Sequence, residues 1–193
     1  IRDVVGSRGL GDVYKRQPNA PDWSSISLRL IDEELDLAQW DVDSFNRRLD
    51  MKAGISYRDA EVTSPRGNKL RLHVEHIANM AHPNLCLIKY SVTSVNYTGK
   101  VSLVPILDGD TANPVRHPDE KIWNILRSGT TSDCAYLWTQ TRREDAQICY
   151  AMTYRFFKNN KETFANPIRI EKEKQAGFSV GTEVKPGDTV TLV

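Results

Sequence analysis

Two aspartates stand close together at the end of an apolar run, in the stretch SLVPILDGDTANP (102–114). Carboxylates so close in sequence can hold a metal ion or share the acid–base work of a glycosidase. A calcium loop of the EF-hand type beginning at Asp108 would need an oxygen ligand at Ala112 and a glycine at Asn113. A glycosidase pair needs carboxyl groups about 5–9.5 Å apart in separate environments, whereas Asp108 and Asp110 flank a single glycine. We therefore interpret both aspartates as turn residues that cap their own backbone.

The histidines and cysteines form no recognisable catalytic or metal-binding set. His73 falls on the polar face of its run, and His76 falls on the apolar parity, where a satisfied core or edge histidine is expected. No serine stands in a nucleophile-elbow context. Cys86, Cys134 and Cys149 are an odd number without C-x-x-C spacing, so we expect small buried hydrophobes and a reducing compartment. The sequence predicts no catalytic residue, no metal site and no cofactor.

Three tryptophans could stack on sugar rings, but core packing is the commoner fate of such residues, and we expect it for Trp23, Trp40 and Trp138. Asn96-Tyr97-Thr98 matches a glycosylation sequon, which matters only in a secreted protein.

The elements that position these residues are predicted by alternation of apolar and polar side chains, which marks half-buried antiparallel strands. The alternating apolar positions are Ile26, Leu28 and Leu30; Leu70, Leu72 and Val74; Cys86, Ile88, Tyr90 and Val92; and Ile148, Tyr150, Met152, Tyr154 and Phe156. Turn residues separate the runs at SPRGN (64–68), NYTG (96–99) and KPGD (185–188). The stretch 90–107 is typical of a hairpin in which Val92 and Val101 flank the turn.

One segment departs from the alternation. HPDEKIWNILRSG (117–129) has Pro118 in its first turn, acids after it, and Gly129 after its last basic residue, which are helix start and stop signals in order. The predicted fold class is therefore all-β, an antiparallel β-sandwich with one short helix.

Length and composition fit a single packed domain. The chain has 193 residues, of which 39% are hydrophobic and 8% aromatic. No apolar run approaches the roughly 18–20 residues that cross a bilayer, and the N-terminus has no apolar core of a secretory signal.

The first seventeen residues, IRDVVGSRGLGDVYKRQ, do not follow the pattern of the rest. Their glycines match no phosphate-binding motif, and the stretch resembles a translated sequencing-adapter tail. We expect residues 1–17 to be a non-native, disordered tail and residues 18–193 to be the native domain. Without the tail the chain is close to neutral, so no basic patch predicts nucleic acid or an anionic membrane as a partner.

Three segments in this order and spacing resemble the N-terminal domain of glycoside hydrolase family 65: RRLDMKAGISYRD (47–59), LDGDTAN (107–113) and DEKIWNIL (119–126). The opening APDWSSISLRLIDEELDL and the ending VKPGDTVTLV are similar to that family as well. The acidic turn Asp32-Glu33-Glu34 lacks the glycine usual there, and Ala78 replaces a common polar residue.

The resemblance implies a galactose-mutarotase-like supersandwich that precedes an (α/α)6 barrel. In that family the general-acid glutamate and the phosphate-binding residues belong to the barrel, to which nothing in residues 18–193 corresponds. We therefore expect a partial, non-catalytic domain that supports the barrel and oligomerisation. A stand-alone carbohydrate-binding module is the alternative.

The resemblance also implies the surroundings of the domain. The parent enzyme would be a maltose, trehalose or kojibiose phosphorylase or a hydrolase, with an α-linked disaccharide as substrate and inorganic phosphate as co-substrate of a phosphorylase. The barrel of the same chain is the expected partner, together with a second copy in a homodimer, in the cytoplasm. Candidate residues of the domain interface are Asp108, Asp110, Asn113 and Trp123.

Overall fold

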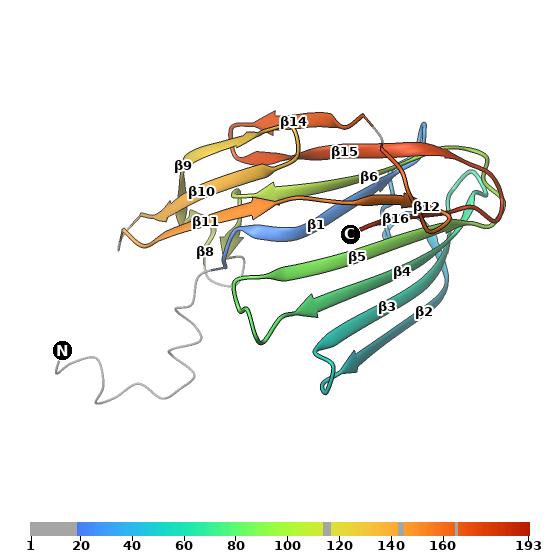
Figure 1. The fold of residues 1–193 in the computed structure, drawn as a ribbon, viewed down its shortest axis with the longest axis horizontal. Coiled ribbons are helices and arrows are strands. Elements are labelled where there is room, and N and C mark those ends of the chain that lie inside the picture. Colours follow the sequence, from blue (N-terminus) through green and yellow to red (C-terminus); the bar gives the residue numbers. More distant parts are fainter. Residues whose placement is uncertain (1–18, 114–116, 143–144, 165) are drawn as a thin grey trace.

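The computed structural model describes residues 19–113, 117–142, 145–164 and 166–193, and every regular element in these ranges is a β-strand. Two large antiparallel sheets face each other, and a three-stranded sheet extends beside the smaller of them (Figure 1). The all-β antiparallel fold is confirmed. The tail predicted at residues 1–17 lies outside the described residues and stays a prediction.

The seven-stranded sheet has the order β13-β12-β16-β5-β4-β3-β2. Its strands are β2 (Asp41–Asp50), β3 (Ile55–Thr63), β4 (Lys69–Ala78), β5 (Cys86–Ser94), β12 (Phe156–Lys158), β13 (Lys161–Glu162) and β16 (Thr189–Leu192).

The four-stranded sheet has the order β1-β6-β15-β14, the three-stranded sheet has the order β11-β10-β9, and β7 pairs with β8 alone. Their strands are β1 (Asp22–Arg29), β6 (Gly99–Asp108), β7 (Ala112–Asn113), β8 (His117–Lys121), β9 (Trp123–Thr130), β10 (Ala135–Thr141), β11 (Gln147–Met152), β14 (Ile168–Lys172) and β15 (Gln175–Val184).

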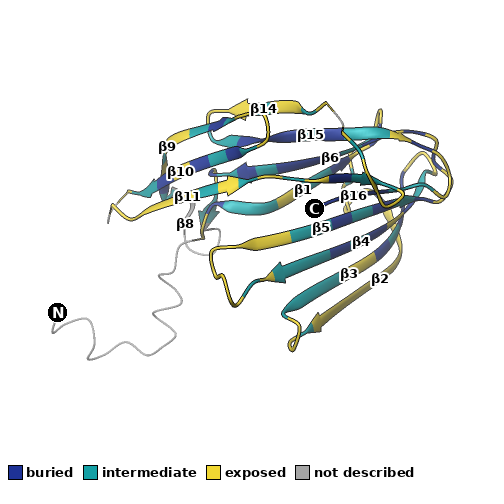
Figure 2. Cartoon of the chain, viewed as in Figure 1, coloured by how far each residue is buried: buried dark blue, intermediate teal, exposed yellow. Residues whose placement is uncertain are grey.

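The core lies between the two large sheets, and buried residues alternate with more exposed ones along central strands such as β4 and β5 (Figure 2). The predicted apolar positions of β4 are all buried, and so are Leu28 and Leu30 in and after β1. Fully buried side chains come from both sheets and from β10: Leu28, Leu70, Val62, Val92, Leu103, Leu107, Leu137, Phe178, Val180 and Val190. Burial of this apolar surface stabilises the fold by roughly 25 cal/mol per Å².

The predicted hairpin over 90–107 is wrong. β5 pairs with β4 and β16, whereas β6 pairs with β1 and β15 in the facing sheet. The turn at 96–99 therefore crosses from one sheet to the other, and so does the turn at 185–188 between β15 and β16. The two crossings are joined: the Ser94 amide donates to the Asp188 carbonyl, and the Gly187 amide donates to the Ser94 carbonyl.

The predicted helix over 117–129 is also wrong, since this stretch forms β8 and most of β9. Trp123 and Ile125, two residues apart, pair with Thr141 and Thr139 of β10. Trp123 is buried, and its indole Nε1 donates to the Asn19 carbonyl at 2.7 Å. Ladder bonds and burial on one strand face outweigh local helix signals, which are a weak prior.

The cysteine prediction is wrong at two of its three positions, since Cys86 and Cys149 are exposed and Cys134 is half-buried. Cys86 lies on the same face of β5 as the buried Tyr90 and Val92. It is nevertheless exposed, because it is the first residue of the strand, opposite Ala78 at the end of β4. Cys149 lies on the outer face of β11, opposite the exposed Trp138.

Candidate functional site

Residues 108–110, which we call the acidic loop, follow the end of β6. They are held by a hydrogen bond within the loop and by contacts with residues at the start of β15. The Asp108 carboxylate Oδ1 accepts the Asp110 amide at 2.8 Å, which is the predicted capping of a turn by its own side chain. The other Asp108 oxygen accepts from Gln175 Nε2 at 2.8 Å, across the ladder between β6 and β15. The Gly109 amide donates to the Lys174 carbonyl at 2.9 Å. Asp108 therefore fixes the loop onto β15.

Asp110 lies between two lysines. Its Oδ1 is 2.9 Å from Lys174 Nζ and 3.2 Å from Lys121 Nζ. The hydrogen bond from Lys174, followed by that from Lys121, lowers the pKa of this carboxyl. Asp110 is thus held ionised near neutral pH, which suits a structural anchor and not a proton donor.

The interface candidates are spread over this region. Asn113 pairs through its backbone with His117 of β8. Trp123 packs inside the domain. Whether these residues or the two aspartates contact another domain stays a prediction. Sequence reasoning missed the loop's partners Gln175, Lys174 and Lys121, because no local signal links them to it.

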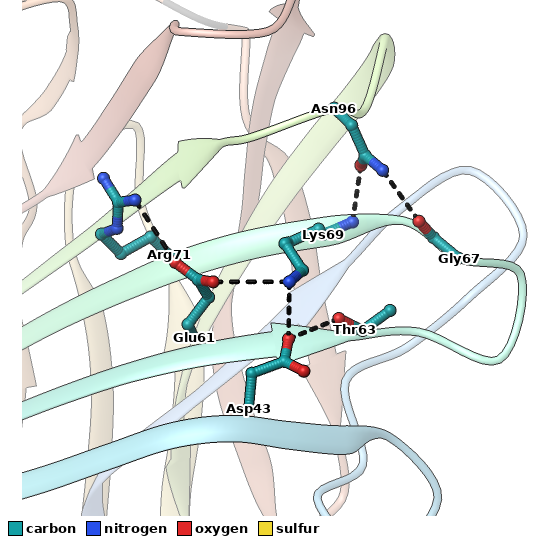
Figure 3. A network of polar contacts seen from close by, with 7 residues as sticks. All are labelled: Asp43, Glu61, Thr63, Gly67, Lys69, Arg71 and Asn96. Atoms are coloured by element: carbon teal, nitrogen blue, oxygen red, sulfur yellow. Dashed lines mark hydrogen bonds and ion pairs between the residues drawn. The ribbon is translucent and has the colours of Figure 1, made fainter.

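The outer face of the seven-stranded sheet carries a matched charge network near one end (Figure 3). Lys69 Nζ lies 3.1 Å from Asp43 Oδ2 and 3.5 Å from Glu61 Oε1, and Arg71 Nη2 donates to the other Glu61 oxygen at 3.3 Å. The hydrogen bond from Thr63, followed by that from Lys69, lowers the pKa of the Asp43 carboxyl. Alternating charge of this kind is typical of a solvated sheet face.

The sequon asparagine belongs to the same end of the sheet. Asn96 Oδ1 accepts the Lys69 amide at 2.6 Å, and its Nδ2 donates to the Gly67 carbonyl at 2.9 Å (Figure 3). Both amide atoms of Asn96 therefore hold the turn between β3 and β4, including Gly67, whose φ is 80°.

The two histidines of β4 lie on opposite faces, as their sequence parity predicts. His73 Nδ1 is 2.6 Å from Asp59 Oδ1, and its Nε2 is 3.1 Å from Glu75 Oε1. The hydrogen bond with Asp59 is the main reason that the pKa of His73 is raised. His76, on the inner face, has its pKa lowered by burial and then by Arg58 and Arg47.

Two of the three tryptophans follow the core-packing prediction. Trp40 is buried, and Trp23 packs partly buried against the core. Trp138 is different, because it is 41% exposed on the outer face of β10.

Among the described residues, no cluster of three or more histidines, cysteines or carboxylates could hold a metal ion. In the same ranges, no helix is long and apolar enough to cross a membrane.

The fold is an antiparallel β-sandwich, and the carboxylates of Asp108 and Asp110 anchor a loop within it. The chain belongs to glycosyl hydrolase family 65, since the model of that family's N-terminal domain matches residues 8–193.

Named relatives agree with this assignment. The kojibiose phosphorylase of Halothermothrix orenii is 30% identical over 189 residues, covering 95% of this chain and 24% of the relative. The α,α-trehalose phosphorylase of Thermoanaerobacter brockii is 30% identical over 130 residues, covering 66% of this chain and 17% of the relative. The maltose phosphorylase of Bacillus subtilis is 29% identical over 133 residues, covering 69% and 17%. The chain thus spans at most about a quarter of these relatives.

A solved structure shares the fold. It comes from the human microbiome, and its name provisionally assigns it as a kojibiose phosphorylase. It superposes with a TM-score of 0.73 at 18% identity, covering 91% of this chain and 22% of the solved chain.

Proposed function

We propose that this domain is the non-catalytic N-terminal β-sandwich of an inverting α-glucoside phosphorylase or hydrolase, where it supports the catalytic barrel and oligomerisation. One observation carries the proposal. The match to the kojibiose phosphorylase runs over 95% of this chain but only 24% of the relative. A domain that is such a small part of larger phosphorylases fits a supporting role, with the chemistry elsewhere.

The electrostatics of the described carboxylates support a non-catalytic role. A general acid must stay protonated near neutral pH, so its pKa has to be raised. In this domain the resolved shifts of carboxyl pKa values are all downward. The groups concerned are Asp43, Glu75, Asp110, Glu162, Glu171 and Asp188. Each is held ionised mainly by hydrogen bonds, so these groups act as acceptors in the scaffold.

A direct assay tests this role. The purified chain is incubated with kojibiose, maltose or trehalose, with and without inorganic phosphate, beside the Halothermothrix orenii kojibiose phosphorylase as positive control. We expect neither glucose 1-phosphate nor glucose from the chain alone. Release of either product in proportion to the amount of chain would overturn the proposal.

A stand-alone carbohydrate-binding module is the second candidate, and the outer face of β10 favours it. Trp138 is exposed there, with Tyr136 two residues earlier on the same face. Gly129 lies opposite Tyr136 and leaves it room, since a Cβ at Gly129 would lie 2.9 Å from the Tyr136 hydroxyl. An aromatic ring on an open sheet can stack on a sugar ring.

Tryptophan fluorescence separates the two candidates. A binding module should show a saturable change with maltose, kojibiose or trehalose that is lost in Trp138→Ala. The supporting-domain proposal predicts no saturable change in either protein.

A further inference from the structure

Two arginines of the β2–β3 hairpin lie directly opposite each other. The register pairs Arg47 with Arg58, and Arg58 with the buried Val74 of β4. Residues directly opposite in a ladder share a face, with Cβ atoms about 4.5–5.5 Å apart, so both arginines belong to the inner face. Like charges at such positions destabilise a sheet. Both residues are exposed, and neither forms an ion pair with any residue in the described ranges.

The positive charge on this face is not balanced by neighbouring side chains. The pKa of His76, on the same face of β4, is lowered first by burial and then by the positive charges of Arg58 and Arg47. The outer face of the same strands is different, because Lys69, Arg71 and Lys89 each lie within 3.5 Å of a carboxylate. The two faces of this sheet therefore differ in charge balance. On the outer face these basic side chains pair with carboxylates, whereas the inner face at Arg47 and Arg58 carries positive charge that no carboxylate in the described residues balances.

Apolar side chains surround the arginines. Phe45 and Leu49 have the same parity on β2 and are 55% and 65% exposed, although they point to the side that elsewhere forms the core. Met51, in the turn after β2, is 86% exposed. Figure 2 shows β2 exposed along almost its whole length. Arginine, methionine and aromatic residues are the types enriched in protein interfaces.

We propose that the Arg47–Arg58 face, made of Phe45, Arg47, Leu49, Met51 and Arg58, docks a protein surface that presents carboxylates between apolar side chains. We place that surface in the part of a family 65 chain outside this domain. This inference rests on the proposed function. A second copy joined through a two-fold axis at this face would bring four arginines together, so the charge selects an acidic surface of another kind.

The experiment uses a full-length chimera in which this chain replaces the matching segment of the Halothermothrix orenii kojibiose phosphorylase. The test variant is Arg47→Glu/Arg58→Glu, and Arg47→Lys/Arg58→Lys keeps the charge. The comparison variant is Arg71→Glu, an exposed charge reversal on the outer face of the next strand that also breaks the Arg71–Glu61 ion pair. All side chains changed are exposed, so the variants should fold. Thermal unfolding and limited proteolysis are measured for each chimera, and sedimentation for the isolated chain with the same changes.

The unsubstituted chimera should unfold in one transition. The double glutamate variant should separate the grafted domain from it, with a Tm lower by at least about 5 °C and faster cleavage between the domains. The lysine variant should keep most of the docking. In the isolated chain the double glutamate change should leave Tm close to the unsubstituted value, because one exposed like-charge pair replaces another.

Three results would overturn the inference. If the double glutamate chimera behaves like the Arg71→Glu control while unfolding in one transition, another face docks and the proposed function still stands. If the grafted domain unfolds separately before any substitution, both the docking face and the supporting role fail. If the isolated chain forms a dimer that the glutamate variant abolishes, the occupant is a second copy.

Discussion

At the residue scale, the two aspartates of the acidic loop make different contacts and should respond differently to substitution. Asp108 accepts an exposed hydrogen bond from a backbone amide and a partly buried one from the Gln175 side chain, while the ion pairs of Asp110 are exposed. Asp108→Ala should lower the free energy of unfolding by about 1–2 kcal/mol. Asp110→Asn should lower it by less than about 1 kcal/mol. Urea denaturation of the purified chain measures both, and a larger loss at Asp110 would contradict this assignment of roles.

The same substitution also tests whether the loop takes part in chemistry. In the full-length chimera, Asp110→Asn should leave kcat within about tenfold, since a general acid contributes about 10²–10⁴ in rate. A thousandfold fall in kcat at unchanged stability would place the loop in an active site.

His73 should make the stability depend on pH. Its folded-state pKa is raised, chiefly by the hydrogen bond with Asp59, so its contribution is fully present below the unfolded pKa of about 6.5. That contribution is lost as pH rises through the higher folded pKa. His76 acts in the opposite sense, because its lowered pKa costs stability as pH falls below about 6.5.

Urea denaturation at pH 5.5 and 8.5 therefore compares the wild type with His73→Gln and His76→Gln. Removing His73 should selectively reduce stability at pH 5.5, by less than about 1 kcal/mol because the side chain is 40% exposed. Removing His76 should selectively improve it there. A His73→Gln loss that is larger at pH 8.5 would contradict the assigned sign.

At the element scale, the close approach of β15 to β6 depends on a glycine. A Cβ at Gly177 would lie 2.2 Å from the Pro105 carbonyl oxygen and 3.0 Å from the Ile106 Cα, both backbone atoms that cannot rotate away. Gly177→Ala should therefore lower the free energy of unfolding by at least about 2 kcal/mol. Gly67→Ala is the comparison, since a Cβ there meets nothing within 4 Å and only the positive φ costs about 1–2 kcal/mol. Equal Tm losses would mean that the two sheet strands can part without cost.

Alternation along the chain was sufficient to predict strands, but not their partners. The buried faces at Leu70, Leu72 and Val74 follow from local period two. The same period at Val92 and Val101 fits either a hairpin or a crossing between sheets, because both bury the alternate residues. Start and stop signals at Pro118 and Gly129 are local as well, whereas the ladder with β10 that determines the outcome is not.

In the candidate site, too, the sequence predicts the local contacts but not those between distant residues. The capping turn at Asp108 follows from the aspartate and glycine beside it, so the sequence predicts it. The contacts with Gln175 and Lys174 join residues more than sixty positions apart. The opposition of Arg47 and Arg58 depends on the register of β2 and β3, including a bulge near Val42, which no local pattern specifies.

At the scale of the whole molecule, the sandwich combines a well-packed centre with a hairpin that projects beyond it. β2 and the end of β3 extend past the facing sheet in Figure 1, and the exposed apolar residues of β2 lie on this part. A domain that serves as one piece of a larger enzyme has a physical reason to keep such a surface. Covering it is the way in which the domain would stabilise its neighbour and be stabilised in turn.

We propose that this chain supplies the N-terminal domain of a family 65 enzyme and not its chemistry. Phosphorolysis of kojibiose by the domain-exchanged Halothermothrix orenii protein tests it most directly, beside the same relative with that segment deleted. We expect glucose 1-phosphate from the exchanged protein, and a loss of activity, folding or both in the protein with the deletion. An exchanged protein that folds but is no more active than the deletion, or a deletion with full activity, would contradict it.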